Sequence, residues 1–88
     1  MPRHIQPGRL AANKKIAEIL FNETYHMEIE GAEEYKIWAY RKAAWAIDEL
    51  DEDVKAVYEK SGVDGLRAIP SIGKKLSKRI AKELENIS

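Results

Sequence analysis

Apolar residues recur at steps of three and four positions along most of this chain. The first such run spans residues 10–29, which is the spacing of an amphipathic α-helix. Gly31 follows the run and ends the predicted helix, and Asn13 is a residue that would cap a shorter version of it. The apolar positions of the run are Ile16, Ile19, Leu20 and Met27.

A second helical run extends over residues 33–50, and its opening carboxylates suit the positive end of a helix. A third, short helix begins near residue 51 with Asp51 as its expected N-cap, buries Val54 and Val57, and ends at residues 61–62. The apolar stripe of the second run is Ile37, Tyr40, Ala43, Ala44 and Ile47.

The last quarter of the chain is predicted to turn sharply and then form one more helix. Residues 63–68 allow a further turn or two of helix, and Pro70 disfavours helical geometry at Ile69. The final helix spans about residues 73–86, and no strand-like alternation occurs anywhere. The expected fold is all-α, a compact bundle of four to five short helices. The final helix would bury Leu76, Ile80, Leu84 and Ile87.

The length of 88 residues predicts a single helical domain over residues 9–88. Residues 1–8 lack periodicity and are expected to form a flexible N-terminal arm. No stretch reaches the roughly 20 apolar residues of a membrane span. The absence of cysteine excludes disulfides and thiolate chemistry and fits an intracellular protein, so we expect a cytoplasmic location.

Charge is balanced overall but unevenly distributed. The chain has 15 basic and 15 acidic residues, yet eleven carboxylates and only three basic residues lie between Glu18 and Asp53. Between Arg67 and Lys82 the opposite holds, since no carboxylate interrupts that segment. Its basic residues are Arg67, Lys74, Lys75, Lys78, Arg79 and Lys82.

The basic residues surround the point where the last helix begins. The first amides of a helix lack partners, and together with the helix dipole and nearby lysines they favour an anion. Gly73 leaves room for a ligand to approach the backbone, and Ser71 could cap the helix. A phosphate backbone is a natural partner for such a surface. A solvated basic helix face is the other interpretation, and the charge pattern alone does not separate the two.

Three segments of the chain carry a resemblance to a known family. Residues 69–73, Ile-Pro-Ser-Ile-Gly, resemble the L-P-G-I-G core of a helix-hairpin-helix motif, here spanning residues 62–86. Upstream, "EEYKIWAYRKAAWAI" resembles a family pattern in which a tyrosine precedes Arg-Lys-Ala-Ala, and "NKKIAEIL" fits the first helix. Over most of residues 10–87 the chain is similar to the N-terminal domain of family X DNA polymerases, the polymerase beta type.

The resemblance implies a module that binds gapped or nicked DNA and holds the 5′-phosphate in a basic pocket. By position, Lys36, Tyr40 and Lys75 match the phosphate-pocket residues of the family. The carbonyl groups of Arg67, Ile69 and Ile72 match those that can hold a monovalent cation, K⁺ or Na⁺, and no other cofactor is expected. With the charge pattern, the expected phosphate-binding residues are Lys36, Tyr40, Ser71, Gly73, Lys74, Lys75, Lys78, Arg79 and Lys82.

Some family members excise deoxyribose phosphate through a lysine Schiff base, and this chain departs from them. Arg79 stands at the position of that lysine, and a guanidinium cannot offer a free amine, so no catalytic residue is expected. Ser71 replaces the first hairpin glycine, and the 88 residues hold no polymerase domain.

Three functions remain open, in this order. The first is a DNA-binding module without sequence specificity, and the second is a deoxyribose-phosphate lyase of base excision repair. The third is a protein-interaction domain that uses the acidic middle or the pair Trp38 and Trp45. These tryptophans suit either half-buried packing or stacking on bases.

Overall fold

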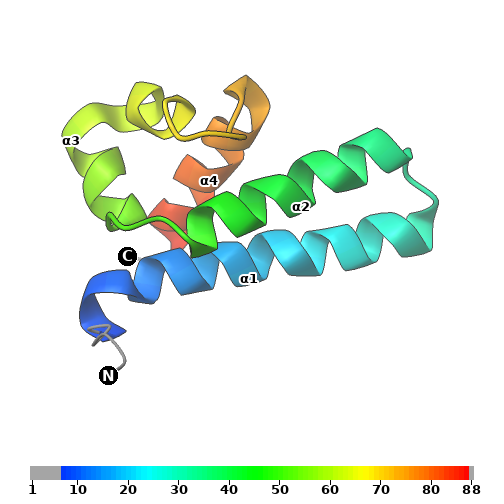
Figure 1. The fold of residues 1–88 in the computed structure, drawn as a ribbon, viewed down its shortest axis with the longest axis horizontal. Helices are drawn as coiled ribbons and strands as arrows, with labels where there is room; N and C mark the ends of the chain where they lie inside the picture. The colour runs from blue at the N-terminus through cyan, green and yellow to red at the C-terminus, as the bar shows by residue number, and fades with distance from the viewer. Residues whose placement is uncertain (1–6, 88) are drawn as a thin grey trace.

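The structure, a computed structural model, describes residues 7–87, with side chains from residue 11 onward, as four helices (Figure 1). They are α1 (Pro7–Glu30), α2 (Glu34–Asp48), α3 (Val54–Arg67) and α4 (Lys74–Asn86). No strand occurs in this part of the chain, which confirms the expected all-α fold.

Helices α1 and α2 form a long antiparallel pair, and α3 and α4 pack at one end of it (Figure 1). The chain reverses between the first two helices at Gly31, whose φ of 76° lies in the left-handed region that glycine adopts without strain. A salt bridge of 3.0 Å joins Arg41 to Glu28, and the rings of Phe21 and Trp45 meet edge to face at 6.5 Å. The connected end of α1 and α2 projects beyond the α3–α4 pair.

Helix α3 is two helical segments joined at a kink. Gly62 has φ 67° and ψ −155°, so the helix breaks there, as the sequence predicts. The cap of α3 differs from the expectation, because Asp53, and not Asp51, precedes the first helical residue and accepts a hydrogen bond of 2.9 Å from the amide of Lys55. The sequence offers three consecutive acidic residues, and the path of the preceding loop selects the last.

The core lies where all four helices meet. Ile16 and Leu20 of α1, like Ile47 of α2, are completely buried, as expected, whereas Ile19 and Met27 of the expected α1 stripe are only partly buried. Tyr40 and Ile87 pack against this core while remaining partly exposed. The completely buried hydrophobic residues of α3 and α4 are Val54, Leu66 and Ile80, and Leu84 is nearly so.

Asn13 is the main departure from the sequence prediction in this part of the fold. It lies in the interior of α1 with 2% of its surface exposed, and it caps no shorter version of that helix. Its Oδ1 accepts a hydrogen bond of 2.7 Å from the amide of Val54, and its Nδ2 donates to the carbonyl of Glu52 at 2.8 Å. Longer contacts of 3.4 Å reach the carbonyls of Ile47 and Leu50. Asn13 therefore fastens the α2–α3 loop to α1.

Helix α1 begins at Pro7, earlier than the expected Leu10, and proline suits the first turn because its missing N–H would have no partner there. Residues 1–6 of the expected arm lie outside the described residues. In the part of the chain that the structure describes, no helix is long and apolar enough to span a membrane.

Candidate nucleic-acid interface

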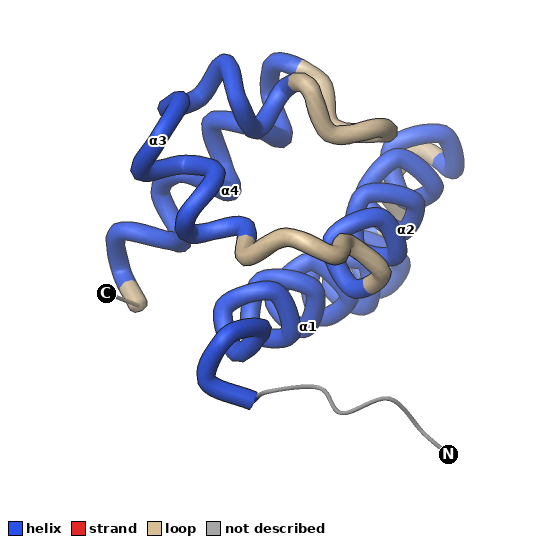
Figure 2. Tube along the Cα trace, turned by 60° about the vertical axis from the view of Figure 1, so that its left-hand side comes forward, coloured by secondary structure: helices blue, strands red, loops and turns tan. Residues whose placement is uncertain are grey.

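The turn between α3 and α4, residues 68–73, is anchored by two isoleucines. The side chains of Ile69 and Ile72 are only 7% and 4% exposed, and the amide of Ile72 donates to the carbonyl of Ile69 at 3.1 Å. The turn lies between the α3–α4 pair and α2 (Figure 2). Because the isoleucines hold it from inside, Pro70 and Ser71 are left on the surface.

At two positions of this turn, the residue type is not the one that the backbone conformation favours. Ser71 has φ 72°, a left-handed conformation in which a non-glycine residue is strained. Gly73 has an ordinary φ of −95°, and an added Cβ would meet nothing within 4 Å. The backbone thus favours glycine at position 71, whereas nothing inside the protein requires it at position 73. An approach by a ligand from outside would account for the small residue at 73.

The N-terminus of α4 has no side-chain cap. Gly73 is the N-cap residue and offers no side chain, so the expectation that Ser71 caps the helix is wrong. The nearest hydroxyl, that of the buried Ser77, donates to the carbonyl of Lys74 at 2.7 Å and so does not serve the first amides. The positive end of this helix is therefore left for solvent or an anion.

Four lysines extend from α4 into solvent. Among the residues that the structure describes, none of them forms an ion pair. Their spacing places them on the side of the helix away from the buried Leu76, Ile80 and Leu84. The exposed lysines are Lys74, Lys75, Lys78 and Lys82.

Arg79 lies apart from these lysines and joins α4 to α1. Its Nε donates to Glu83 at 2.9 Å, and its terminal nitrogen lies 3.3 Å from a carboxylate oxygen of Glu23. Burial alone would lower the pKa of this guanidinium, but the hydrogen bonds to Glu83 and Glu23 outweigh it and the pKa is raised. Arg79 therefore remains a cation whose charge two carboxylates already balance.

A hollow of about 380 Å³ lies between the first half of α2 and the start of α4, and we call it the α2–α4 hollow. It brings together Lys36, Tyr40 and Lys75, which are far apart in the sequence. Tyr40 packs against the core, whereas both lysines are exposed. Two ammonium groups and a phenol around one concave surface are suited to an oxyanion.

The sequence prediction missed part of the wall of this hollow. Tyr35, with 66% of its surface exposed, and Met27 from α1 complete the lining together with Ala39 and Leu76. The available signal was a large aromatic residue directly before Lys36 and off the apolar stripe of α2.

Of the three backbone carbonyl groups expected to bind a monovalent cation, those of Ile69 and Ile72 lie in this turn and that of Arg67 lies directly before it, at the end of α3. The carbonyl of Ile69 accepts the amide of Ile72 and keeps its second lone pair, so it is compatible with a cation. The side chains of Ile69 and Ile72 occupy the core, and Arg67 is exposed at the end of α3. Neutral carbonyl oxygens are the donors that such a cation prefers.

The profile of one protein family, described as the helix-hairpin-helix domain, matches residues 11–87 of the chain. No curated protein and no solved structure matches significantly. Helix-hairpin-helix domains generally bind DNA without sequence specificity. The match covers nearly all of the residues that the structure describes, including the turn, both halves of the α2–α4 hollow and the exposed lysines, and the chain therefore belongs to the helix-hairpin-helix domain family.

Proposed function

We propose that this protein is a DNA-binding module that grips the phosphate backbone with the N-terminus of α4 and holds a 5′-phosphate of gapped or nicked duplex in the α2–α4 hollow. In this role it would resemble the N-terminal domain of family X DNA polymerases, with residues 9–88 as the working unit. The observation that carries the proposal is the α2–α4 hollow, because it joins Lys36, Tyr40 and Lys75, the three residues that the resemblance assigns to the phosphate.

The residues of the site would have different roles in binding DNA. Lys75 and Lys36 would neutralise the terminal phosphate, and the Tyr40 hydroxyl would donate to one of its oxygens. The uncapped amides after Gly73 would bind an internal phosphate of the same strand. Ser71 would lie beside that phosphate, and Lys74, Lys78 and Lys82 would attract the backbone at longer range.

In this proposal Arg79 does not contact the DNA directly, because Glu23 and Glu83 already bind its guanidinium. It contributes to the site by joining α4 to α1. The same two contacts disfavour the alternative of a lyase, which needs an uncharged amine at that place. Borohydride trapping on a 5′-deoxyribose-phosphate end tests the alternative directly. A covalent adduct that survives Lys36→Ala but not Lys75→Ala would identify a Schiff base at Lys75.

The carbonyls of Arg67, Ile69 and Ile72 would hold K⁺ or Na⁺ in the turn, where the cation would support the phosphate beside it. Replacing both ions with tetramethylammonium at constant ionic strength should then weaken DNA binding. Unchanged affinity would remove the cation from the proposal and leave the phosphate contacts untouched.

The deciding experiment measures binding of fluorescent gapped duplexes that end in a 5′-phosphate or a 5′-hydroxyl. Lys75→Ala should weaken binding of the phosphorylated duplex roughly tenfold and of the hydroxyl duplex much less. Lys60→Ala, which removes an equal charge from the exposed face of α3, is the matched control. Equal losses on both duplexes would contradict the assignment of the α2–α4 hollow to a terminal phosphate.

Gly73→Ala separates binding from folding. The φ of this residue suits alanine and its Cβ would meet no atom within 4 Å, so the free energy of unfolding should change by no more than about 1 kcal/mol, the range of an N-cap preference. A methyl group at the N-terminus of α4 would nevertheless obstruct a phosphate, and affinity for every duplex should decrease. Unaltered affinity would show that DNA does not approach α4 at this point.

A further inference from the structure

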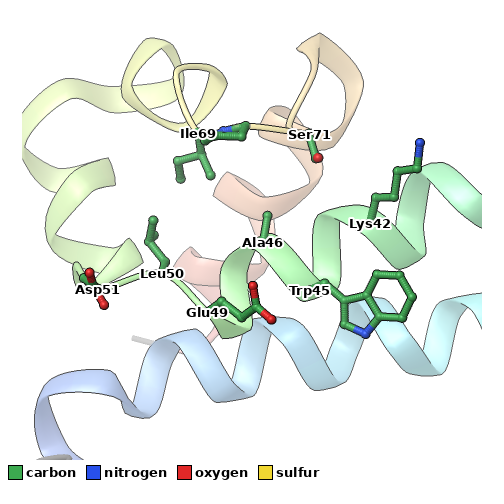
Figure 3. A pocket seen from close by; sticks show the side chains of 9 residues that line it. Lys42, Trp45, Ala46, Glu49, Leu50, Asp51, Ile69 and Ser71 are labelled. Atoms are coloured by element: carbon green, nitrogen blue, oxygen red, sulfur yellow. The ribbon is translucent and has the colours of Figure 1, made fainter.

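A second and larger hollow lies beneath the turn that precedes α4, and we call it the sub-hairpin hollow (Figure 3). Its volume is about 560 Å³, within the range of pockets that hold small organic ligands. The C-terminal half of α2 forms one side and the turn forms the other. The residues that matter for its chemistry are Lys42, Trp45, Glu49, Leu50, Ile69 and Ser71.

Apolar groups and one aromatic ring dominate this surface. Leu50 and Ile69 face each other across the hollow in Figure 3. Trp45 lies at one end of it, 46% exposed, and its ring packs against the rings of Phe21 and Trp38, with ring centres 6.5 Å and 6.1 Å apart. A large aromatic ring that its neighbours hold in place and that remains half exposed is a platform for a flat ligand.

The charges around the sub-hairpin hollow are separated. Lys42 extends from α2 toward the side that carries the turn, and the carboxylate of Glu49 lies one to two helical turns further along α2 (Figure 3). Within the described residues neither side chain forms an ion pair. A fitting ligand therefore combines a flat apolar ring with an anionic group at one end and an N–H donor at the other. A nucleotide whose base is unpaired and carries an exocyclic amine has all three.

We propose that the sub-hairpin hollow binds an unpaired nucleobase of the DNA held at the neighbouring turn. The base stacks on Trp45, its phosphate pairs with Lys42, and its exocyclic amine donates to Glu49. The inference rests on the proposed DNA binding, and it adds a preference for DNA with an unpaired dC, dA or dG, the bases that have an exocyclic amine, over intact duplex. The hollow reaches Ser71, so a strand bound at the turn can deliver a base to it without leaving the protein surface.

The first test compares a duplex that has a one-nucleotide gap opposite dC with the same duplex after the missing dG has been inserted and the strand ligated. Trp45→Ala should weaken binding of the gapped duplex roughly tenfold and leave the intact duplex unchanged. Tyr25→Ala is the control, because Tyr25 is an exposed aromatic residue that does not line the hollow. Trp38→Ala is unsuitable, because the ring of Trp38 packs against that of Trp45 at 6.1 Å. Weaker binding of every duplex by Gly73→Ala would support the broader function whichever result Trp45→Ala gives.

The second test keeps Trp45 intact. The chain has two tryptophans, so Trp38→Phe leaves Trp45 as the single reporter. Gapped duplex should quench its emission and intact duplex should not, and a gap opposite dC should bind more tightly than one opposite dT, which has no exocyclic amine. The inference is overturned if gapped and intact duplexes change the Trp45 fluorescence equally and Trp45→Ala leaves both DNA affinities unchanged. A hollow that serves a protein partner would give that result while backbone binding persisted.

Discussion

Replacing Asn13 with alanine should destabilise the fold more than any other single polar change in α1. The amide of Val54 is buried with its residue, and without the Asn13 Oδ1 it loses its 2.7 Å partner, at a cost of about 1–3 kcal/mol. The Glu52 carbonyl loses its 2.8 Å partner but belongs to an exposed residue, so its loss is about 0.5–1.5 kcal/mol. The sum is about 1.5–4.5 kcal/mol.

That loss is large for a domain of this size. At about 0.05–0.15 kcal/mol per residue, the free energy of unfolding of 88 residues is roughly 4–13 kcal/mol. Denaturant unfolding followed by far-ultraviolet circular dichroism measures the change as a lower midpoint at constant slope. Asn22→Ala is the matched control, since Asn22 is exposed on the same helix and its replacement should change stability by less than about 0.5 kcal/mol.

Asn13→Asp makes the same contact depend on pH. A protonated aspartic acid can still donate to the carbonyl of Glu52, whereas a carboxylate would face the carbonyl oxygens of residues 47, 50 and 52 without a proton to donate. The folded protein should hold this proton above the unfolded pKa of about 3.9, so stability should fall as pH rises, by up to about 1.4 kcal/mol per unit. Asn22→Asp should show no such slope. If Asn13→Ala and Asn22→Ala unfold at the same denaturant concentration, the role assigned to Asn13 is wrong.

Three further predictions concern the α3–α4 half. Ser71→Gly should raise the free energy of unfolding by about 0.5–1 kcal/mol in a denaturant titration, because it relieves the left-handed φ of 72°; destabilisation would contradict that strain. Gly65→Ala should cost about 1–3 kcal/mol, since its Cβ would lie 2.6 Å from the Cβ of Ser61, and Ser61→Gly should restore part of the loss. Tyr58 donates a hydrogen bond of 2.6 Å to Glu85, and this bond, with burial, raises the pKa of the phenol above 10.0. The stabilisation that the hydrogen bond gives is therefore complete below pH 10.0 and is lost as the pH rises through the higher pKa of the folded state. Glu85→Gln should lower the pKa of Tyr58 in an ultraviolet titration.

The parts of the fold that the sequence predicted are those set by local periodicity. The apolar stripes of α2 and α4 appear directly in the spacing of residues such as Ile47 and Ile80, and the kink in α3 follows from Gly62. Helix ends were less predictable, because three adjacent acidic residues compete to cap α3 and only the loop path chooses Asp53.

The features of the fold that the sequence did not predict depend mainly on contacts between residues that are distant in the sequence. Asn13 occupies a position on the apolar stripe of α1, three residues before Ile16, and a polar residue there is a signal of a buried hydrogen-bonding role. The partners of that role lie about forty residues away in the α2–α3 loop and leave no local trace. Gly65 is a local case instead, since the residues that crowd it, Ser61 and Val57, lie in the same helix and come close only because α3 is kinked at Gly62.

The candidate site also contains residues that the sequence could identify and contacts that it could not. Lys36, Tyr40 and Lys75 could be named from the family resemblance, and the structure brings them into one hollow. The two glutamates that bind Arg79 could not be foreseen, because Glu23 comes from the middle of α1 and only packing brings it to α4. Charge along a helix predicts a basic surface but not which of its cations are already neutralised.

Helix α1 takes part in the tertiary contacts of every other helix. It supplies Asn13 to the start of α3, Glu23 to α4, and Phe21 and Glu28 to α2. A synthetic peptide containing only α3 and α4 would thus lack the scaffold that gives its turn a fixed shape. The half of this molecule that contains the turn between α3 and α4 is not a transplantable motif, and protein engineers who graft it elsewhere should carry its long first helix along.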